Sequence, residues 1–200
     1  MSQLTAMMNE LDTAMINQAI SELKIEDIIT KHAKAAAATA LGAGIATFIF
    51  PVASAVVDVL VSTGIIWSMY SRISRELGIP MSKNLLKTLG SAFLSNIVAN
   101  LGGALLLELT VSCVPAVGVA ASAAICYGIT YLAGCLFIKL LVNVFKAGKR
   151  PEMMTEAELK ELGKKTSAEV NCKKIFKDAQ NEAKERIKKG EITKADQIDE

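Results

Sequence analysis

The sequence predicts an all-α protein made of two hydrophobic helical hairpins, flanked by an amphipathic N-terminal helix and charged C-terminal helices. The distribution of charge carries this prediction. Residues 35–71 contain one charged side chain, Asp58, and residues 88–138 contain one, Glu108, although the chain of 200 residues has 22 Lys and Arg and 20 Asp and Glu. A water-soluble monomer of this size shows polar side chains along most of its elements. We therefore expect the uncharged stretches to be surrounded by lipid or by other subunits.

Composition divides the chain into three parts. We predict an amphipathic N-terminal helix, a hydrophobic helical membrane domain and a charged cytoplasmic helical tail, over residues 1–30, 31–146 and 147–200.

The N-terminal part has apolar residues at helical spacing, at Leu4, Met8, Leu11 and Met15. The polar side of this helix, over residues 4–23, is acidic, so we expect it to pack on protein and not on anionic lipid. The first 30 residues have five acidic residues and one lysine, the reverse of a secretory signal. We therefore expect the N-terminus to remain in the cytosol.

The hydrophobic part contains four apolar segments, separated at Pro51 and near Pro115. As helices, the first would be about 24 Å long and the others about 30–35 Å. A hydrocarbon core is about 30 Å thick and needs about 20 residues. The second hairpin can therefore span, whereas the first segment is short enough to be tilted or re-entrant. The four segments are residues 35–50, 52–71, 88–107 and 116–138.

Basic residues flank these segments, but neither predicted turn contains one. If each pair of segments forms a hairpin, all flanking cations fall on one side of the membrane. The positive-inside bias then places both termini and the central linker in the cytoplasm of a protein of the inner or plasma membrane. Trp67 and Tyr70 lie at the basic end, where we expect an aromatic belt. The flanking cations are Lys31, Lys34, Arg72, Arg75, Lys83, Lys87, Lys139, Lys146, Lys149 and Arg150.

Small residues recur every four positions in three of the segments. In lipid, helices associate where small residues let their backbones approach closely, so this spacing favours helix packing and a homo-oligomer. An alanine-rich core of a soluble protein has similar spacing and stays open as the alternative. The residues concerned include Gly42, Ala46, Ala99, Gly103, Ala120, Ala124 and Gly128.

Four polar residues interrupt the apolar segments: Asp58, Glu108, Asn96 and Asn100. A carboxylate at the centre of a membrane helix is costly, so it usually marks a function or a partner. One interpretation is a proton or ion path, or the lining of a pore. The other, which we favour, is hydrogen bonding between helices and a location near the interface.

Two cytoplasmic helices are predicted after residue 150, over residues 156–162 and 167–189. Thr155 with Glu158, and Thr166 with Glu169, match the capping-box pattern, and Gly163 and Gly190 suit helix ends. The second helix has a thin apolar stripe, which could dock on a partner or on the basic linker, or leave the helix solvated. The stripe consists of Val170, Ile175, Phe176, Ala179, Ala183 and Ile187.

No catalytic or cofactor-binding pattern is recognisable, so we expect no enzyme, cofactor or metal site. The only histidine, His32, lies between lysines and is expected at an interface. The segment from Gly163 to Thr166 lacks the glycine and residue order of a phosphate-binding loop. The cysteines show no metal-binding spacing and are expected to be small hydrophobic residues. The near-neutral balance of charge argues against nucleic acid as a partner.

Two separated motifs resemble the YcjF-like hydrophobic domain of unknown function. The first runs from Pro51 to Asp58 and continues from Met69 to Gly78, and the second runs from Val114 to Gly134. In that family the domain commonly follows an Era-like GTPase domain and is thought to lie in or on membranes. This chain contains no GTPase domain. The resemblance therefore implies a membrane-associated helical module that works with a separate GTPase.

Together these observations predict a membrane-associated helical scaffold or adaptor that binds the lipid bilayer, self-associates and recruits a cytoplasmic partner such as a GTPase. Two alternatives remain open. One is a pore-forming or channel protein with the four polar residues facing a lumen. The other is a soluble helical oligomer that buries its apolar helices between subunits, or exposes them only on triggering.

Overall fold

The computed structural model is all-helical over the residues that it describes, in agreement with the predicted fold class. No strand occurs among them. The predicted N-terminal helix over residues 4–23 lies outside the described residues, apart from Gln18, which is helical. The structure describes residues 18, 24–43, 51–79, 81–112, 117–194 and 196, without the side chains of residues 43, 51–62, 98, 100, 102–112 and 117.

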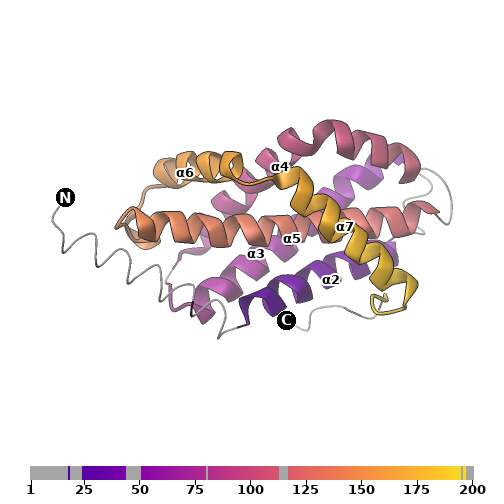
Figure 1. The fold of residues 1–200 in the computed structure, drawn as a ribbon, viewed down its shortest axis with the longest axis horizontal. Helices are drawn as coiled ribbons and strands as arrows, with labels where there is room; N and C mark the ends of the chain where they lie inside the picture. Colours follow the sequence, from indigo (N-terminus) through magenta and orange to yellow (C-terminus); the bar gives the residue numbers. More distant parts are fainter. Residues whose placement is uncertain are drawn as a thin grey trace.

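Each long helix combines an apolar segment with polar sequence, so the helices extend beyond the segments predicted from composition (Figure 1). The N-terminal boundary predicted at residue 30 falls inside the first described helix. In chain order the elements are α2 (Ile25–Ala43), α3 (Pro51–Glu76), α4 (Lys83–Ser112), α5 (Val117–Lys146), the short 3-10 helix η2 (Pro151–Met153), α6 (Glu156–Glu169) and α7 (Cys172–Lys188).

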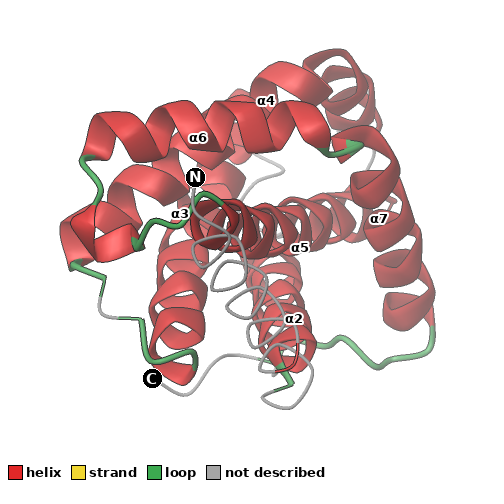
Figure 2. Cartoon of the chain, turned by 60° about the vertical axis from the view of Figure 1, so that its left-hand side comes forward, coloured by secondary structure: helices red, strands yellow, loops and turns green. Residues whose placement is uncertain are grey.

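Helix α5 is the centre of the bundle. It contacts α2, α3, α4, α6 and α7, and Figure 2 shows it enclosed by these helices. Its buried residues include Leu132, Leu136, Phe137 and Leu140, none of which is exposed to solvent. A helix that is apolar on all sides must be covered on all sides in water, and here the chain itself provides the cover.

Tyr70 joins α3 to α5 in the main core. Its ring stacks on Phe137 at a centroid distance of 4.1 Å and lies edge-on to Phe93 of α4. Its hydroxyl donates a hydrogen bond to the Ala133 carbonyl oxygen at 3.0 Å. Tyr70 is fully buried, so the prediction that it belongs to an interfacial aromatic belt is wrong. The polar tip finds its partner inside the bundle because the α5 backbone is within reach.

Helices α2 and α5 approach closely through small residues. A buried cluster contains Ala33, Ala36, Ala37 and Ala40 of α2 together with Ala123 and Ala124 of α5. A Cβ atom added to Gly134 of α5 would lie 2.8 Å from the Ile29 side chain. The small residues therefore bring these two helices of one chain together.

The start of α6 follows the predicted capping box. Thr155 accepts a hydrogen bond from the Glu158 amide at 3.3 Å, and Glu158 accepts one from the Thr155 amide at 2.9 Å. The second predicted capping box is wrong, because Thr166 lies inside α6 and is buried, and Asn171 caps α7. The helix end predicted at Gly163 is also wrong, since α6 continues through this residue to Glu169.

Gly163 instead lies where α6 packs on α4, with room for a Cβ atom in ordinary van der Waals contact. A Cβ atom there would be 3.6 Å from the Phe93 ring. The prediction of a helix end is confirmed at Gly190, which adopts φ +71° directly after α7. Only a residue without a side chain takes this left-handed conformation easily, so the glycine stops the helix.

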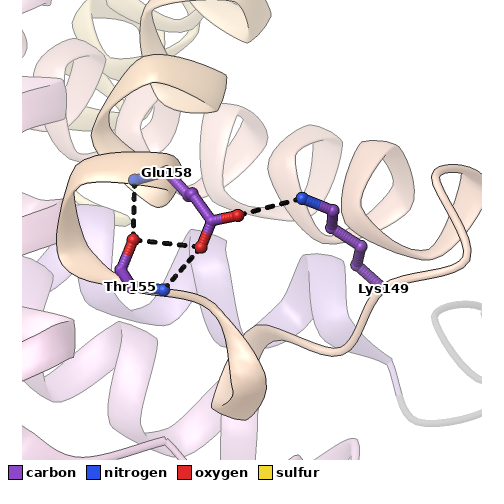
Figure 3. Close-up of polar contacts among 3 residues, drawn as sticks. All are labelled: Lys149, Thr155 and Glu158. Carbon is purple, nitrogen blue, oxygen red and sulfur yellow. Dashed lines mark hydrogen bonds and ion pairs between the residues drawn. The ribbon is translucent and has the colours of Figure 1, made fainter.

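Figure 3 shows the carboxylate of Glu158 between two neighbours. The Thr155 amide and hydroxyl donate to Oε2, and the ammonium of Lys149 donates to Oε1 at 3.0 Å. The backbone hydrogen bond from Thr155, followed by the hydrogen bond from Lys149, lowers the pKa of Glu158 from its usual 4.5 to about 2. The charged form is thus favoured in the folded chain.

We expect Glu158→Gln to remove part of the acid sensitivity of folding. Because the folded-state pKa is depressed, the stabilisation is present above pH 4.5 and is lost as the pH falls towards 2. Unfolding by urea at a series of pH values measures it. Glu161→Gln on the exposed side of α6 is the control. Equal pH dependence of the wild type and Glu158→Gln would contradict this assignment.

Candidate functional site

The described helix ends that flank the two uncharged predicted turns lie at the same end of the bundle. Helix α2 packs antiparallel to α5, since Ile29 contacts Gly134 while Ala40 lies in the cluster with Ala123. Helix α3 packs antiparallel to α4, with Trp67 against Gly90. Figure 1 accordingly shows the end of α2, the start of α3, the end of α4 and the start of α5 at one end, on the right. We call it the apolar end.

The opposite end carries the cations that flank the apolar segments, and the chain's own acids neutralise several of them. Lys149 pairs with Glu158 at 3.0 Å, and Lys139 lies 3.8 Å from Glu169. Every ion pair that the structure describes uses a carboxylate from residues 152–191. The C-terminal helices therefore supply counter-charges to the basic end of the hydrophobic part.

The four polar residues of the apolar segments fall at two levels along the bundle. The contact between Trp67 and Gly90 sets the register of α3 against α4, and it places the backbone of Asp58 level with the stretch that contains Asn96 and Asn100. Glu108 is about 13 Å nearer the apolar end. Asn96 is half-buried and already has an interaction within the chain. The backbone thus brings three of the four residues to one level and separates the fourth.

The predicted packing residues occupy different environments. Ala124 and Gly128 of α5 are buried and Ala120 is half-buried, whereas Gly42 and Ala99 are exposed. Among the described residues, no atom outside the backbone of α2 itself lies within 4 Å of a Cβ added to Gly42. Gly103 lies in α4 with its surroundings undescribed, and Ala46 is outside the described residues.

Helix α7 covers one side of α5. Phe176, Ala179 and Ala183 are buried in this contact, and the ring of Phe176 lies in a notch formed by Gly128. A Cβ atom on Gly128 would be 2.9 Å from that ring. The apolar stripe of the C-terminal tail therefore docks on an apolar helix of its own chain. Both residues are packing candidates from the sequence alone, but only the tertiary structure shows that they contact each other.

A second contact fixes α7 on α5 at a point nearer the start of α5. Ala183 packs in the cluster with Ala123 and Ala124, and the Tyr127 hydroxyl donates to Glu182 at 3.4 Å. The outer face of α7 is charged, with residues such as Lys177, Asp178 and Glu185 exposed. Helix α7 therefore separates α5 from water along most of one side.

In the described part of the chain, one helix has the length and apolar composition needed to cross a membrane, Gly118–Lys146. It is the central helix, and 72 % of its most apolar stretch is buried inside the bundle. The core helix of a water-soluble bundle meets the same criterion. Of the four predicted apolar segments, only the fourth lies in such a helix within the described residues.

His32 is a core residue and not an interfacial one. Its ring is 1 % exposed, and Nδ1 lies 2.7 Å from the Ile28 carbonyl oxygen, to which it donates. Burial, the largest effect, lowers the pKa of His32 below 6.5 despite this hydrogen bond. The described residues contain no group of three side chains able to hold a metal ion. The ring is accordingly assigned a structural role.

Comparisons with known proteins do not assign this arrangement to a family. No family model, no curated protein and no solved structure matches the chain.

We expect Gly128→Ala to weaken the docking of α7 on α5. The added methyl group overlaps the Phe176 ring, and overpacking of this kind costs about 1–3 kcal/mol. The free energy of unfolding from urea titration measures the loss, and hydrogen exchange locates it in α7.

Gly42→Ala is the matched control. It adds the same methyl group to a helix at an open position, so its effect should be neutral or slightly stabilising. Equal destabilisation by both substitutions, or unchanged protection of α7 in Gly128→Ala, would contradict the notch.

Proposed function

We propose that this chain is a membrane-associated helical scaffold or adaptor. It enters the bilayer with the apolar end and keeps its basic end, α6, α7 and both termini in the cytoplasm. The observation that carries the proposal is the segregation of charge along the bundle. The helix ends that flank both uncharged turns lie together, and the basic flanking residues lie at the opposite end. Positive-inside bias gives that polarity its orientation.

The docked position of α7 limits the depth of insertion. At Ala183, helix α7 is level with Ala123, about 9 Å from the start of α5, and it continues towards that end as far as Lys188. Its exposed lysines and acids would each be costly in hydrocarbon. With α7 docked, the bundle enters one leaflet by its apolar end, in the manner of interfacial proteins. Complete crossing by the hairpin of α4 and α5 requires α7 to leave.

The outward face of α4 supports self-association. Ser91, Ser95 and Ala99 follow one another at helical spacing and are all exposed. Small residues of this kind allow a second copy to approach closely. The predicted packing role of Ala99 is therefore proposed for a contact between chains.

The outer faces of α6 and α7 suit a protein partner. They carry exposed charges of both signs, such as Lys164, Lys177 and Asp178. A mixed pattern fits an electrostatically complementary protein surface better than a phosphate backbone. The resemblance to the YcjF-like domain suggests a separate GTPase as that partner.

Two thiol reporters test membrane insertion, each in a chain whose half-buried Cys135 is replaced by Ala. The first is native Cys113, which falls between α4 and α5 in the sequence. The second is Asn181→Cys on the exposed side of α7, combined with Cys113→Ser. Native Cys172 is a poor reporter because it is 5 % exposed. We expect the protein in the membrane fraction, with neither thiol labelled by an impermeant maleimide on intact cells.

After permeabilisation, the thiol of Asn181→Cys should react at once, and Cys113 only when detergent removes the bilayer. Recovery of the protein in the soluble fraction, as a monomer or as an assembly, would reject the proposal. Labelling of Asn181→Cys on intact cells would reject the orientation.

Substitutions on α4 test self-association. We expect Ser95→Leu combined with Ala99→Leu to convert an oligomer to monomers in detergent, because large side chains keep the helices apart. Light scattering after size exclusion measures the mass. Ser68→Leu, at an exposed position of α3, is the control. An unchanged mass in the α4 variant would contradict this contact.

The cover formed by α7 favours a second candidate, a pore-forming protein that inserts fully when α7 is released. In that state Asp58, Asn96 and Asn100 lie at one level of a membrane hairpin. Gly128→Ala then increases the labelling of Cys113 from outside intact cells and the release of dye from vesicles, whereas Gly42→Ala leaves both unchanged.

A further inference from the structure

A polar recess lies between α4 and α6, apart from the apolar end and from the contact of α7 with α5. It is a wide, open recess on the surface, with a volume of about 400 Å³. Thr88, Ser91, Ala92 and Ser95 line it from one face of α4, and Lys87 and Lys160 complete the lining. None of these four α4 side chains is larger than threonine, so the space between the two helices stays open.

The contact between the two helices supports the recess. Leu159 of α6 is fully buried, and Gly163 lies against the Phe93 ring of α4. Lys160 follows Leu159 directly, so the packed leucine places the lysine beside the recess. Lys87 is held in turn over the Trp67 ring, with its ammonium 5.2 Å from the ring centroid.

The recess is positively charged. Its lining contains two lysines and no carboxylate. Within the described part of the chain, the ammonium groups of Lys87 and Lys160 form no ion pair, although six other ion pairs are present. A cation over an aromatic face keeps its charge and can still attract an anion.

The hydroxyl groups add donors between the two charges. Ser95 already donates its hydroxyl proton to the Ser91 carbonyl oxygen at 2.9 Å, so it can only accept from a ligand. The side-chain hydroxyls of Thr88 and Ser91 have no hydrogen bond to the described residues, so they can donate to a ligand. Two lysines and two hydroxyl donors therefore line the recess.

We propose that this recess binds the phosphate group of a phosphate monoester. A monoester presents three terminal oxygens and close to two negative charges, which match two lysines and two hydroxyl donors. A carboxylate has two oxygens and one charge, and it would leave part of this set unused. Several hundred cubic ångströms exceed the phosphate itself, so the ester carries a small organic group.

The phosphate can belong to a lipid or to a soluble metabolite, and the position of the recess is compatible with both. Lys87 lies in the second turn of α4, about 37 Å from the apolar end of that helix. This distance exceeds the hydrocarbon thickness of about 30 Å. A lipid headgroup reaches the recess if the bundle inserts deeply, whereas a soluble ester reaches it at any depth.

Binding of two probes to the full chain separates these sources. One probe is glycerol 3-phosphate in solution, and the other is phosphatidic acid in phosphatidylcholine vesicles. Vesicles with phosphatidylglycerol, a phosphodiester, control for lipid charge. We expect Lys87→Gln combined with Lys160→Gln to weaken binding of the phosphate monoester about tenfold or more, because two charge-assisted hydrogen bonds are lost.

Two further variants separate the recess from general charge. Lys164→Gln with Lys165→Gln removes the same charge from exposed positions of α6 outside the recess, and should change affinity less than about twofold. Ser91→Leu fills the recess while both lysines remain, and should abolish binding. Thermal unfolding followed by circular dichroism checks that each variant folds.

Binding of phosphatidic acid alone identifies a lipid source, and binding of glycerol 3-phosphate identifies a soluble one. The proposal is overturned if neither probe binds or if Ser91→Leu binds normally. It is also overturned if the Lys164→Gln, Lys165→Gln variant loses as much affinity as the Lys87→Gln, Lys160→Gln variant. Attachment to vesicles of phosphatidylcholine alone reports on the apolar end. Absence of this attachment would count against membrane association and not against the recess.

Discussion

Burial of α5 is the constraint on which the rest of the bundle depends. This helix is apolar on all sides, and each large side chain that it buries contributes about 1.5–3 kcal/mol. Five helices are needed to cover it, and they come from both sides of it in the sequence. The alanines of α2 allow the closest approach on one side, and the notch at Gly128 admits Phe176 of α7 on another.

The same constraint gives α7 opposite requirements on its two faces. Its inner face is a narrow row of small and aromatic residues that fits α5, and its outer face is charged. A contact of this kind is favourable in water and unfavourable in hydrocarbon, because the charged face loses its solvation there. The position of α7 therefore decides how much of α5 lipid can reach. By its composition α5 resembles a membrane segment, because composition carries no information about the helix that covers α5.

Local signals in the sequence were reliable where neighbouring residues interact. The capping box of Thr155 with Glu158 and the helix end at Gly190 depend on contacts within one turn, and both occur as predicted. Thr166 and Gly163 carry the same local signals but lie inside α6. There, Asn143 of α5 donates to the Thr166 hydroxyl at 3.1 Å, and Phe93 of α4 packs on Gly163. Tertiary contacts override a local preference when they satisfy the same groups at lower cost.

By itself the sequence determined the helical class, the approximate extent of the helices and the polarity of the chain, since these follow from periodicity and from the positions of charges. It also identified Gly128 and Phe176 as candidates for packing. Only the tertiary structure decided that these two meet, that Tyr70 and His32 are core residues, and that lysines from α4 and α6 line one recess. Each of these facts depends on how distant helices are placed side by side, and periodicity along one helix carries no information about which neighbour faces it.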